Sequence, residues 1–395
     1  MVNASHWVVQ GLDYLIPPRR GLVACHSSPD FDDMILALLA ETPATCSIAV
    51  LADDKPRALR RMRDLQLPPV HVQSKRSLRG LFTYLRSEHS VSTHGLFGAR
   101  RRGRRKSSST PWHGEFSKQI GTLIGQPGKY FDIAVVSTPQ SKFQRSTEFA
   151  LAPQHIHVVG TPRQSTLAHG PRADRAARLK GRDRWLLFAP TYRQSKGSAL
   201  DVDSALSMEY QEESLGRLDQ VVRSTGGTLW VRPHPVAEPY SSLPPTARMA
   251  TDDDLQRLGL TLYDMLGATD LLITDYSSIW IDFLAKDRPV IAFCPDIEDY
   301  RDARGLALEP YEAWFPGPVV TSADELCAET ARLLEGHDDH RSKRSWVRSV
   351  LCPDRPEAAR AYWSLLLDDR TARRRRRGGT PPPASGAGRP DPSAV

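Results

Sequence analysis

The segment Leu271-Leu-Ile-Thr-Asp-Tyr-Ser-Ser-Ile-Trp280 decides the fold, because a strand pattern passes into a helix pattern without a linker. Its first four residues predict a buried strand over 271–274, and a short helix is predicted over 278–285. The free N–H groups at the start of such a helix, together with the Ser277 and Ser278 hydroxyls, suit a phosphate group. The simpler alternative is that Asp275 or Ser277 only caps the helix.

The same alternation of short apolar runs and helical patterns occurs along most of the chain. It predicts an α/β fold with two Rossmann-like, doubly wound domains facing a cleft, and ligands bound at the carboxyl ends of the strands. The other predicted strands are 21–25, 46–51, 132–136, 155–159, 185–189, 228–231 and 290–293, and helices are predicted over 31–39 and 206–224.

The length of 395 residues fits two domains. Gly, Pro and charged residues cluster over 165–181, so we expect an N-terminal domain over 1–170 and a C-terminal domain over 181–370. Residues 371–395 are rich in Arg, Pro and Gly and contain almost no apolar residues, which predicts a disordered tail.

The net charge of +7 comes from two local basic runs. Six basic residues lie in 100–106 and five in 373–377, so the rest of the chain carries a charge of −4. Such runs attract nucleic acid or anionic lipid, and the alternative is a solvated loop and a solvated tail.

The composition is that of a globular protein in a reducing compartment. The five cysteines are scattered, and none forms a Cys-x-x-Cys pair. No signal peptide and no apolar run long enough to span a bilayer is recognised, and neither is a phosphate loop of the Walker type or a His/Cys metal spacing. We therefore expect a cytoplasmic protein without a cofactor, and nothing in the sequence indicates a metal.

Two histidines stand where a polar loop follows a predicted structural element. His234 lies between Pro233 and Pro235, which stiffen the backbone, and it could neutralise a phosphate or donate a proton. His113 precedes Gly114, where a substrate could approach the backbone, and it could act as a general base. The alternatives are a histidine satisfied within a turn and a bystander beside a core Trp112.

Other polar residues follow predicted strands or begin a predicted helix. Thr191 and Arg193 form a possible phosphate-binding pair, whereas Glu325 could be a simple carboxylate at a helix start. The remaining candidates of this kind are Arg163, Arg232, Arg301 and Arg304.

Taken in order, these motifs resemble the CDP-glycerol glycerophosphotransferase family of the teichoic-acid polymerase and primase type. The resemblance covers about 93–326. It is carried by Trp112-His-Gly-x-x-x-Lys118, Gly160-Thr-Pro-Arg163, Ala189-Pro-Thr-Tyr-Arg193, His234-Pro235, Thr274-Asp-Tyr-Ser-Ser278 and Arg304-Gly305.

The resemblance implies a fold like that of GT-B glycosyltransferases and the transfer of glycerol phosphate, or a related polyol phosphate, from CDP-glycerol to a hydroxyl acceptor, with release of CMP. It implies that His113 and His234 are catalytic, with His113 as the base. The donor-side residues would be Arg193, Arg232, Thr274, Asp275, Ser277, Ser278, Arg304 and Glu325, and the acceptor-side residues Gly114, Lys118 and Arg163.

The expected partners are a CDP-polyol donor and a lipid-linked or polymeric acceptor. The two basic runs could hold the protein at the inner face of the cell membrane. A GT-B glycosyltransferase using a sugar nucleotide is the alternative function. A polyanion-binding protein without enzymatic activity is a third possibility, although we expect no nucleic-acid partner.

Overall fold

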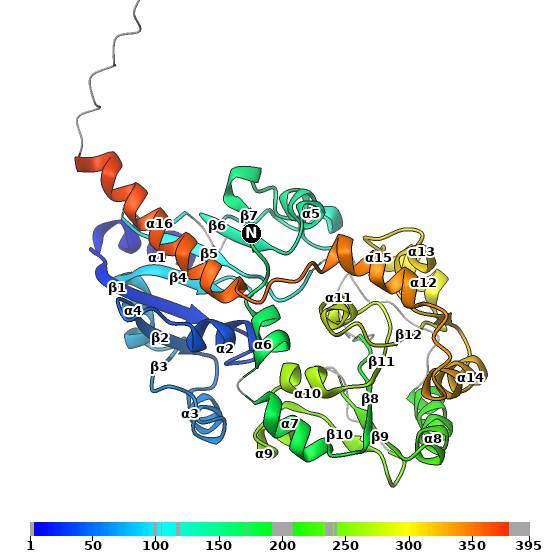
Figure 1. Ribbon diagram of the computed structural model, residues 1–395. Helices are drawn as coiled ribbons and strands as arrows, with labels where there is room; N and C mark the ends of the chain where they lie inside the picture. The colour runs from blue at the N-terminus through cyan, green and yellow to red at the C-terminus, as the bar shows by residue number, and fades with distance from the viewer. Residues whose placement is uncertain are drawn as a thin grey trace, which may run out of the picture.

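The computed structural model describes residues 4–97, 101–103, 105–115, 119–170, 172–191, 208–233, 240 and 243–378. Two parallel sheets, each flanked by helices, make up these residues (Figure 1). This confirms the predicted class of two Rossmann-like, doubly wound domains.

The first sheet has seven strands in the order β3-β2-β1-β4-β5-β6-β7, and all its pairs are parallel. The order reverses between β1 and β4, and this switch point is where doubly wound sheets bind ligands. The strands are β1 (Arg19–His26), β2 (Ser47–Ala52), β3 (His71–Ser74), β4 (Ser87–Ser92), β5 (Ser107–Thr110), β6 (Ile133–Val136) and β7 (Ile156–Val158).

The second sheet has six strands in the order β10-β9-β8-β11-β12-β13, again with parallel pairs. Its switch point lies between β8 and β11. Strand β11 forms the start of the segment 271–280. The strands are β8 (Arg184–Phe188), β9 (Gly227–Val231), β10 (Arg248–Met249), β11 (Leu271–Thr274), β12 (Val290–Phe293) and β13 (Val319–Val320).

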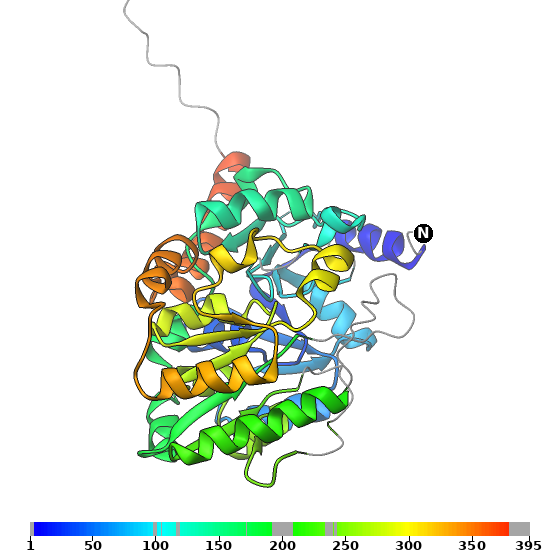
Figure 2. The ribbon, with the colours of Figure 1, turned by 90° about the vertical axis from the view of Figure 1, so that its right-hand side faces the viewer.

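Helices cover both faces of each sheet, as the crossovers between parallel strands require. On the second sheet α8 and α14 pack side by side over one face (Figure 2). The helices of the first domain and the linker are α1 (Ala4–Leu15), α2 (Asp33–Ala40), α3 (Lys55–Asp64), α4 (Leu78–Arg86), α5 (Pro139–Phe149), α6 (Arg163–His169) and α7 (Ala173–Lys180), with the short turns η1 (Gly121–Ile124) and η2 (Pro153–His155). Those that follow are α8 (Met208–Ser224), α9 (Asp252–Arg257), α10 (Leu262–Ala268), α11 (Ile279–Phe283), η3 (Leu284–Lys286), α12 (Ile297–Arg304), α13 (Tyr311–Trp314), α14 (Ala323–Leu334), α15 (Arg341–Leu351) and α16 (Ala358–Gly378).

The last helix, α16, returns to the first sheet, although the sequence predicts 181–370 as one domain. Tyr362 and Trp363 are buried in the core of the first domain, and the Trp363 indole donates to the Leu38 carbonyl at 2.9 Å. The helix also continues to Gly378, past the predicted start of the disordered tail at 371. Arginine favours helix, so an arginine run can extend a helix that tertiary contacts have already started.

The first basic run is only partly a surface feature, which corrects the expectation of a charged loop. The Arg102 and Lys106 side chains are buried and both pair with Asp13, at 3.0 and 2.9 Å. Arg101 and Arg105 are exposed. Two of the six basic side chains therefore lie inside the domain and share one carboxylate, because a buried cation needs a partner.

No helix in the described part of the chain is both long and apolar enough to cross a bilayer.

Candidate functional site

The carboxyl ends of β8 and β11 are held together by Asp275. Its carboxylate accepts hydrogen bonds from the Thr191 backbone N–H at 2.8 Å and from the Thr191 hydroxyl at 2.6 Å, and from the Ser277 N–H at 3.2 Å. Asp275 is fully buried, and the neighbouring Thr274 hydroxyl donates to the Ala189 carbonyl at 2.6 Å. The Asp275 and Thr274 side chains, predicted as donor-binding, thus shape this sheet edge.

Ser277 and Ser278 are the polar residues at this edge that stay partly exposed. Ser278 stands at the N-cap position of α11, and its side chain makes no capping hydrogen bond. The Ile279 N–H at the helix start donates to the Ser277 Oγ at 3.5 Å, so Ser277 partly serves as a cap, as the simpler alternative holds. The Ser278 hydroxyl beside this helix start is a group that suits an anion.

His113 lies in the loop after β5, and its orientation is set by backbone and ring contacts. Its Nδ1 lies 3.2 Å from the Thr93 carbonyl oxygen, and its ring stacks on that of His94 with centroids 4.1 Å apart. A carbonyl can only accept, so Nδ1 carries the proton in the neutral ring and Nε2 keeps a free lone pair. That tautomer can accept a proton from a hydroxyl.

The surroundings of the two stacked rings keep them neutral. Desolvation by the surrounding protein, followed by the nearby His94, lowers the pKa of His113 well below its usual value, although the residue as a whole is exposed. Desolvation also lowers the pKa of His94 to about 4. At neutral pH His113 is therefore in the form that a general base requires.

The loop that carries His113 touches the serine edge of the second domain. A Cβ atom placed on Gly114 would lie 2.7 Å from the Ser278 Oγ, so the loop approaches Ser278 closely and a larger residue would have to displace this hydroxyl. A few residues later, the Gln119 N–H donates to the Gly305 carbonyl at 3.3 Å. The structure thus brings His113 and Gly114 together with Ser278, as their places at two facing sheet edges predict.

Arg163 joins the same loop to α11. Its guanidinium donates to the His113 carbonyl at 2.7 Å and pairs with the Asp282 carboxylate at 2.6 Å. Asp282 also accepts from the Tyr263 hydroxyl at 2.8 Å. Arg163 was predicted to lie on the acceptor side, but its donor groups are engaged by protein, and 7% of the residue is exposed. Its position fits a residue that aligns His113 with α11.

Arg232 and Glu325, both predicted as donor-binding, make local structural contacts. Arg232 donates to the Ala250 carbonyl and pairs with Asp252 at 2.7 Å. Glu325 completes the capping box of α14 with Ser322, and hydrogen bonds from the backbone at the helix start lower the pKa of its carboxyl. For Glu325, the structure supports the simpler alternative of a helix-start carboxylate.

Four further predicted residues cannot be placed in this arrangement. His234, Arg193 and Lys118 lie outside the described residues, and so does the side chain of Arg304. Their proposed roles stay predictions.

A polar cluster at the same carboxyl edge of the first sheet was not predicted. His26 ends β1, Asp30 and Asp53 follow β1 and β2, and each offers one ligand atom within 4.8 Å of the others. The Lys75 ammonium lies 2.6 Å from Asp53 and 3.1 Å from the His26 Nε2. A lysine thus already supplies a cation to these groups. Their position directly after strands was the signal that could have indicated them.

Two Rossmann-like domains that meet through a histidine loop and a serine-capped helix define a GT-B-like protein. The model of the CDP-Glycerol:Poly(glycerophosphate) glycerophosphotransferase family matches residues 51–360, so the chain belongs to this family. This confirms the resemblance seen in the sequence.

Relatives and solved structures agree with this assignment. The chain is 28% identical to the teichoic acid ribitol-phosphate primase of Bacillus spizizenii over 50% of its length and 49% of the relative's. It is 30% identical to the teichoic acid poly(glycerol phosphate) polymerase of Bacillus subtilis over 42% of its length and 22% of the relative's. The chain thus spans about half or less of these relatives.

The structure of the wall teichoic acid polymerase TagF superposes with a TM-score of 0.73 at 16% identity, covering 93% of both chains. At this identity the likeness shows the fold.

Proposed function

We propose that the protein transfers a polyol phosphate from a CDP-polyol to a hydroxyl acceptor and releases CMP, in the synthesis of teichoic acid or a related cell-surface polymer. The proposal rests on family membership and on one observation, the contact of Gly114 with Ser278. That contact joins the loop of His113 in one domain to a helix start of the other, which we propose binds the donor pyrophosphate.

In the proposed reaction, the His113 Nε2 takes the proton of the acceptor hydroxyl. The acceptor oxygen then forms a bond to the phosphorus that carries the polyol, and the bond from that phosphorus to the bridging oxygen breaks. CMP leaves with the electron pair. Ser277, Ser278 and the N–H groups of α11 would hold the pyrophosphate, and positioning and charge stabilisation of this kind are the main requirements of phosphoryl transfer. The family resemblance adds His234 and Arg304 to this group.

The identity of the polyol needs a direct test, because the relatives include both ribitol-phosphate and glycerol-phosphate enzymes. Purified protein is incubated with CDP-glycerol or CDP-ribitol and a lipid-linked or polyol-phosphate acceptor, and CMP is quantified. We expect CMP from one of the two donors in an acceptor-dependent reaction. If neither donor yields CMP and uridine or guanosine nucleotides raise the unfolding temperature instead, the protein is a sugar-nucleotide glycosyltransferase.

We propose that the acceptor is lipid-linked and that the protein meets it at the inner membrane surface. Since Arg102 and Lys106 are buried, the proposed contact with anionic lipid depends mainly on the run 373–377. Replacing these five arginines with glutamine should release the protein from vesicles that contain anionic lipid, and raised salt should do the same. Retention of this variant on the vesicles at low salt would contradict the proposed contact.

A further inference from the structure

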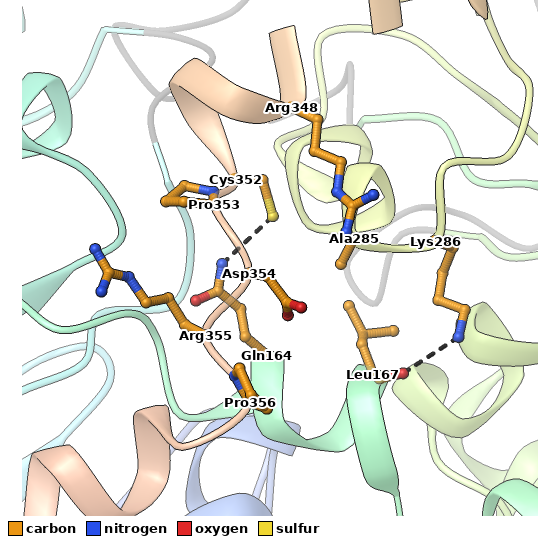
Figure 3. A pocket seen from close by; sticks show the side chains of 10 residues that line it. All are labelled: Gln164, Leu167, Ala285, Lys286, Arg348, Cys352, Pro353, Asp354, Arg355 and Pro356. Carbon is orange, nitrogen blue, oxygen red and sulfur yellow. Dashed lines mark hydrogen bonds between the residues drawn. The ribbon is translucent and has the colours of Figure 1, made fainter. Parts of the chain in front are cut away.

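A pocket of about 250 Å³ lies at the joint between the two domains (Figure 3). Four segments build it: α6, the turn η3, the end of α15 and the segment that connects α15 to α16. It adjoins the ion pair of Arg163 and Asp282, because Gln164 follows Arg163 directly and η3 begins two residues after Asp282. The reaction proposed above uses none of the side chains that line it.

Positive charge dominates this joint pocket, which is lined by Lys286, Arg348 and Arg355 but by one acidic residue, Asp354. Among the described residues, neither Lys286 nor Arg348 forms an ion pair with a carboxylate. The Lys286 ammonium instead donates to the Leu167 carbonyl at 3.3 Å. Figure 3 shows the Lys286 and Arg348 side chains on one side of the pocket, with the Arg355 guanidinium pointing away from them.

The wall of the joint pocket is already ordered. Gln164 is 5% exposed, and its amide oxygen accepts from the Thr161 N–H at 3.0 Å while its amide nitrogen lies 3.4 Å from the Cys352 sulfur. A Cβ atom on Gly160 would lie 2.8 Å from the Arg355 Cβ, so the loop before α6 and the linking segment pack closely. A preformed wall lowers the entropy that a ligand must overcome on binding.

Burial at this position leaves the Lys286 charge poorly compensated. Desolvation, followed by repulsion from Arg288, lowers the pKa of the Lys286 ammonium. An anion beside Lys286 and Arg348 would relieve this, since charge-assisted hydrogen bonds to phosphate are among the stronger ones and arginine can bind phosphate in a bidentate manner.

We propose that the joint pocket binds a small phosphate monoester of a polyol, with the phosphate between Lys286 and Arg348. Its volume of about 250 Å³ equals that of roughly eight waters at about 30 Å³ each, which accommodates a phosphate with a short carbon chain. The carbon chain would lie against Leu167 and Pro353. Asp354 is the built-in competitor, because its carboxylate lines the same space as the two cations.

The bound phosphate would connect α6, η3 and the segment before α16, and so stabilise the joint between the domains. Binding itself does not depend on the proposed transferase activity. It is therefore measured without donor or acceptor, so that a failure of one proposal leaves the other standing.

The test is calorimetric titration and thermal unfolding of the full chain with glycerol 3-phosphate, inorganic phosphate or sulfate at constant ionic strength. We expect glycerol 3-phosphate to bind more tightly than inorganic phosphate and sulfate. At tenfold excess over its Kd it should raise the unfolding temperature by roughly 2 °C. Equal affinity for all three anions would overturn the assignment to a phosphorylated polyol.

Variants that remove a positive or a negative charge from the joint pocket should change the affinity in opposite directions and so locate the site. Lys286→Gln or Arg348→Gln should weaken binding by about tenfold or more, because each removes a charge-assisted hydrogen bond. Asp354→Asn should tighten binding, and it makes the test independent of any variant that folds poorly. Glu335→Gln makes the same charge change on an exposed helix end and should leave the affinity unchanged.

Ser278→Ala separates the joint pocket from the proposed donor site. We expect this variant to bind glycerol 3-phosphate as the unmodified protein does. An affinity that falls with Ser278→Ala and is unaffected by Lys286→Gln and Asp354→Asn would place the ligand at the donor site and refute the inference.

Discussion

The two sheets share one strand order, but the residues at their two switch points differ in chemistry. At the β8/β11 edge, the Asp275 carboxylate accepts hydrogen bonds from Thr191 and is buried. Ser277 and Ser278, at the start of α11, are the residues that stay partly exposed there. At the β1/β4 edge, the Thr93 carbonyl and the His94 ring hold His113 in a neutral tautomer. One edge thus suits an anion and the other a proton acceptor, and Gly114 brings them into contact.

Removing the proton acceptor should have the largest effect on activity. His113→Ala should lower turnover by about 10²- to 10⁴-fold, because general-base catalysis contributes that much. CDP-polyol binding, measured by calorimetry, should change little, since the serine edge is untouched. His337→Ala, which alters an exposed histidine elsewhere, serves as the control. Full activity of His113→Ala would show that His113 is not the general base and that the two edges do not differ in the way described.

Breaking the link between the two edges should have the next largest effect. Arg163→Met leaves Asp282 buried without its partner, so we expect a loss of unfolding free energy of about 3–5 kcal/mol. Urea unfolding measures this loss. Arg332→Met, which removes the cation from exposed ion pairs, should change the stability far less. If the two variants lose equal stability, Arg163 is not the residue that joins His113 to α11.

The contact at Gly114 predicts a smaller effect that depends on its partner. Gly114→Ala places a methyl group 2.7 Å from the Ser278 hydroxyl oxygen and should lower kcat/KM by about 10- to 100-fold, or 1–3 kcal/mol. In a Ser278→Ala background the same substitution should cost clearly less, because the clashing oxygen is gone. Equal costs in both backgrounds would show that the two edges act independently.

The sequence predicted the structure of one edge better than that of the other. The apolar run 271–274 coincides with β11, since a buried parallel strand reads as a continuous hydrophobic stretch. Strands β4 and β5 were not predicted because they are polar, with the sequences SEHSVS and SSST. Their burial is possible because their hydroxyls find partners in neighbouring strands, as the Thr110 hydroxyl does with the Ser92 carbonyl at 2.7 Å.

Long-range contacts account for the remaining differences. The return of α16 depends on Trp363 meeting Leu38, and the burial of Arg102 depends on Asp13. Neither pairing leaves a local pattern, because the partners are far apart in sequence. For the candidate site, motifs at sheet edges indicated His113, Gly114 and Ser278, and the structure places Gly114 against Ser278, while their roles stay predictions. For Asp275 and Glu325 the sequence left both a ligand role and a helix-start role open, and the structure shows contacts of both with nearby backbone.

The pH dependence of kcat/KM should show the smallest effect. It tests only the edge of the first sheet that carries His113. Because desolvation lowers the pKa of His113 below 6.5, the neutral base persists as the pH falls through that value. We therefore expect kcat/KM to be flat from pH 8 to about pH 6.5, with the acidic limb appearing only at lower pH. A histidine of ordinary pKa would already be half protonated near pH 6.5, about a twofold loss. An acidic limb centred at or above pH 6.5 would show that the imidazole is charged by a partner. The proposed difference between the two edges, a neutral base at one and an anion site at the other, would then be wrong.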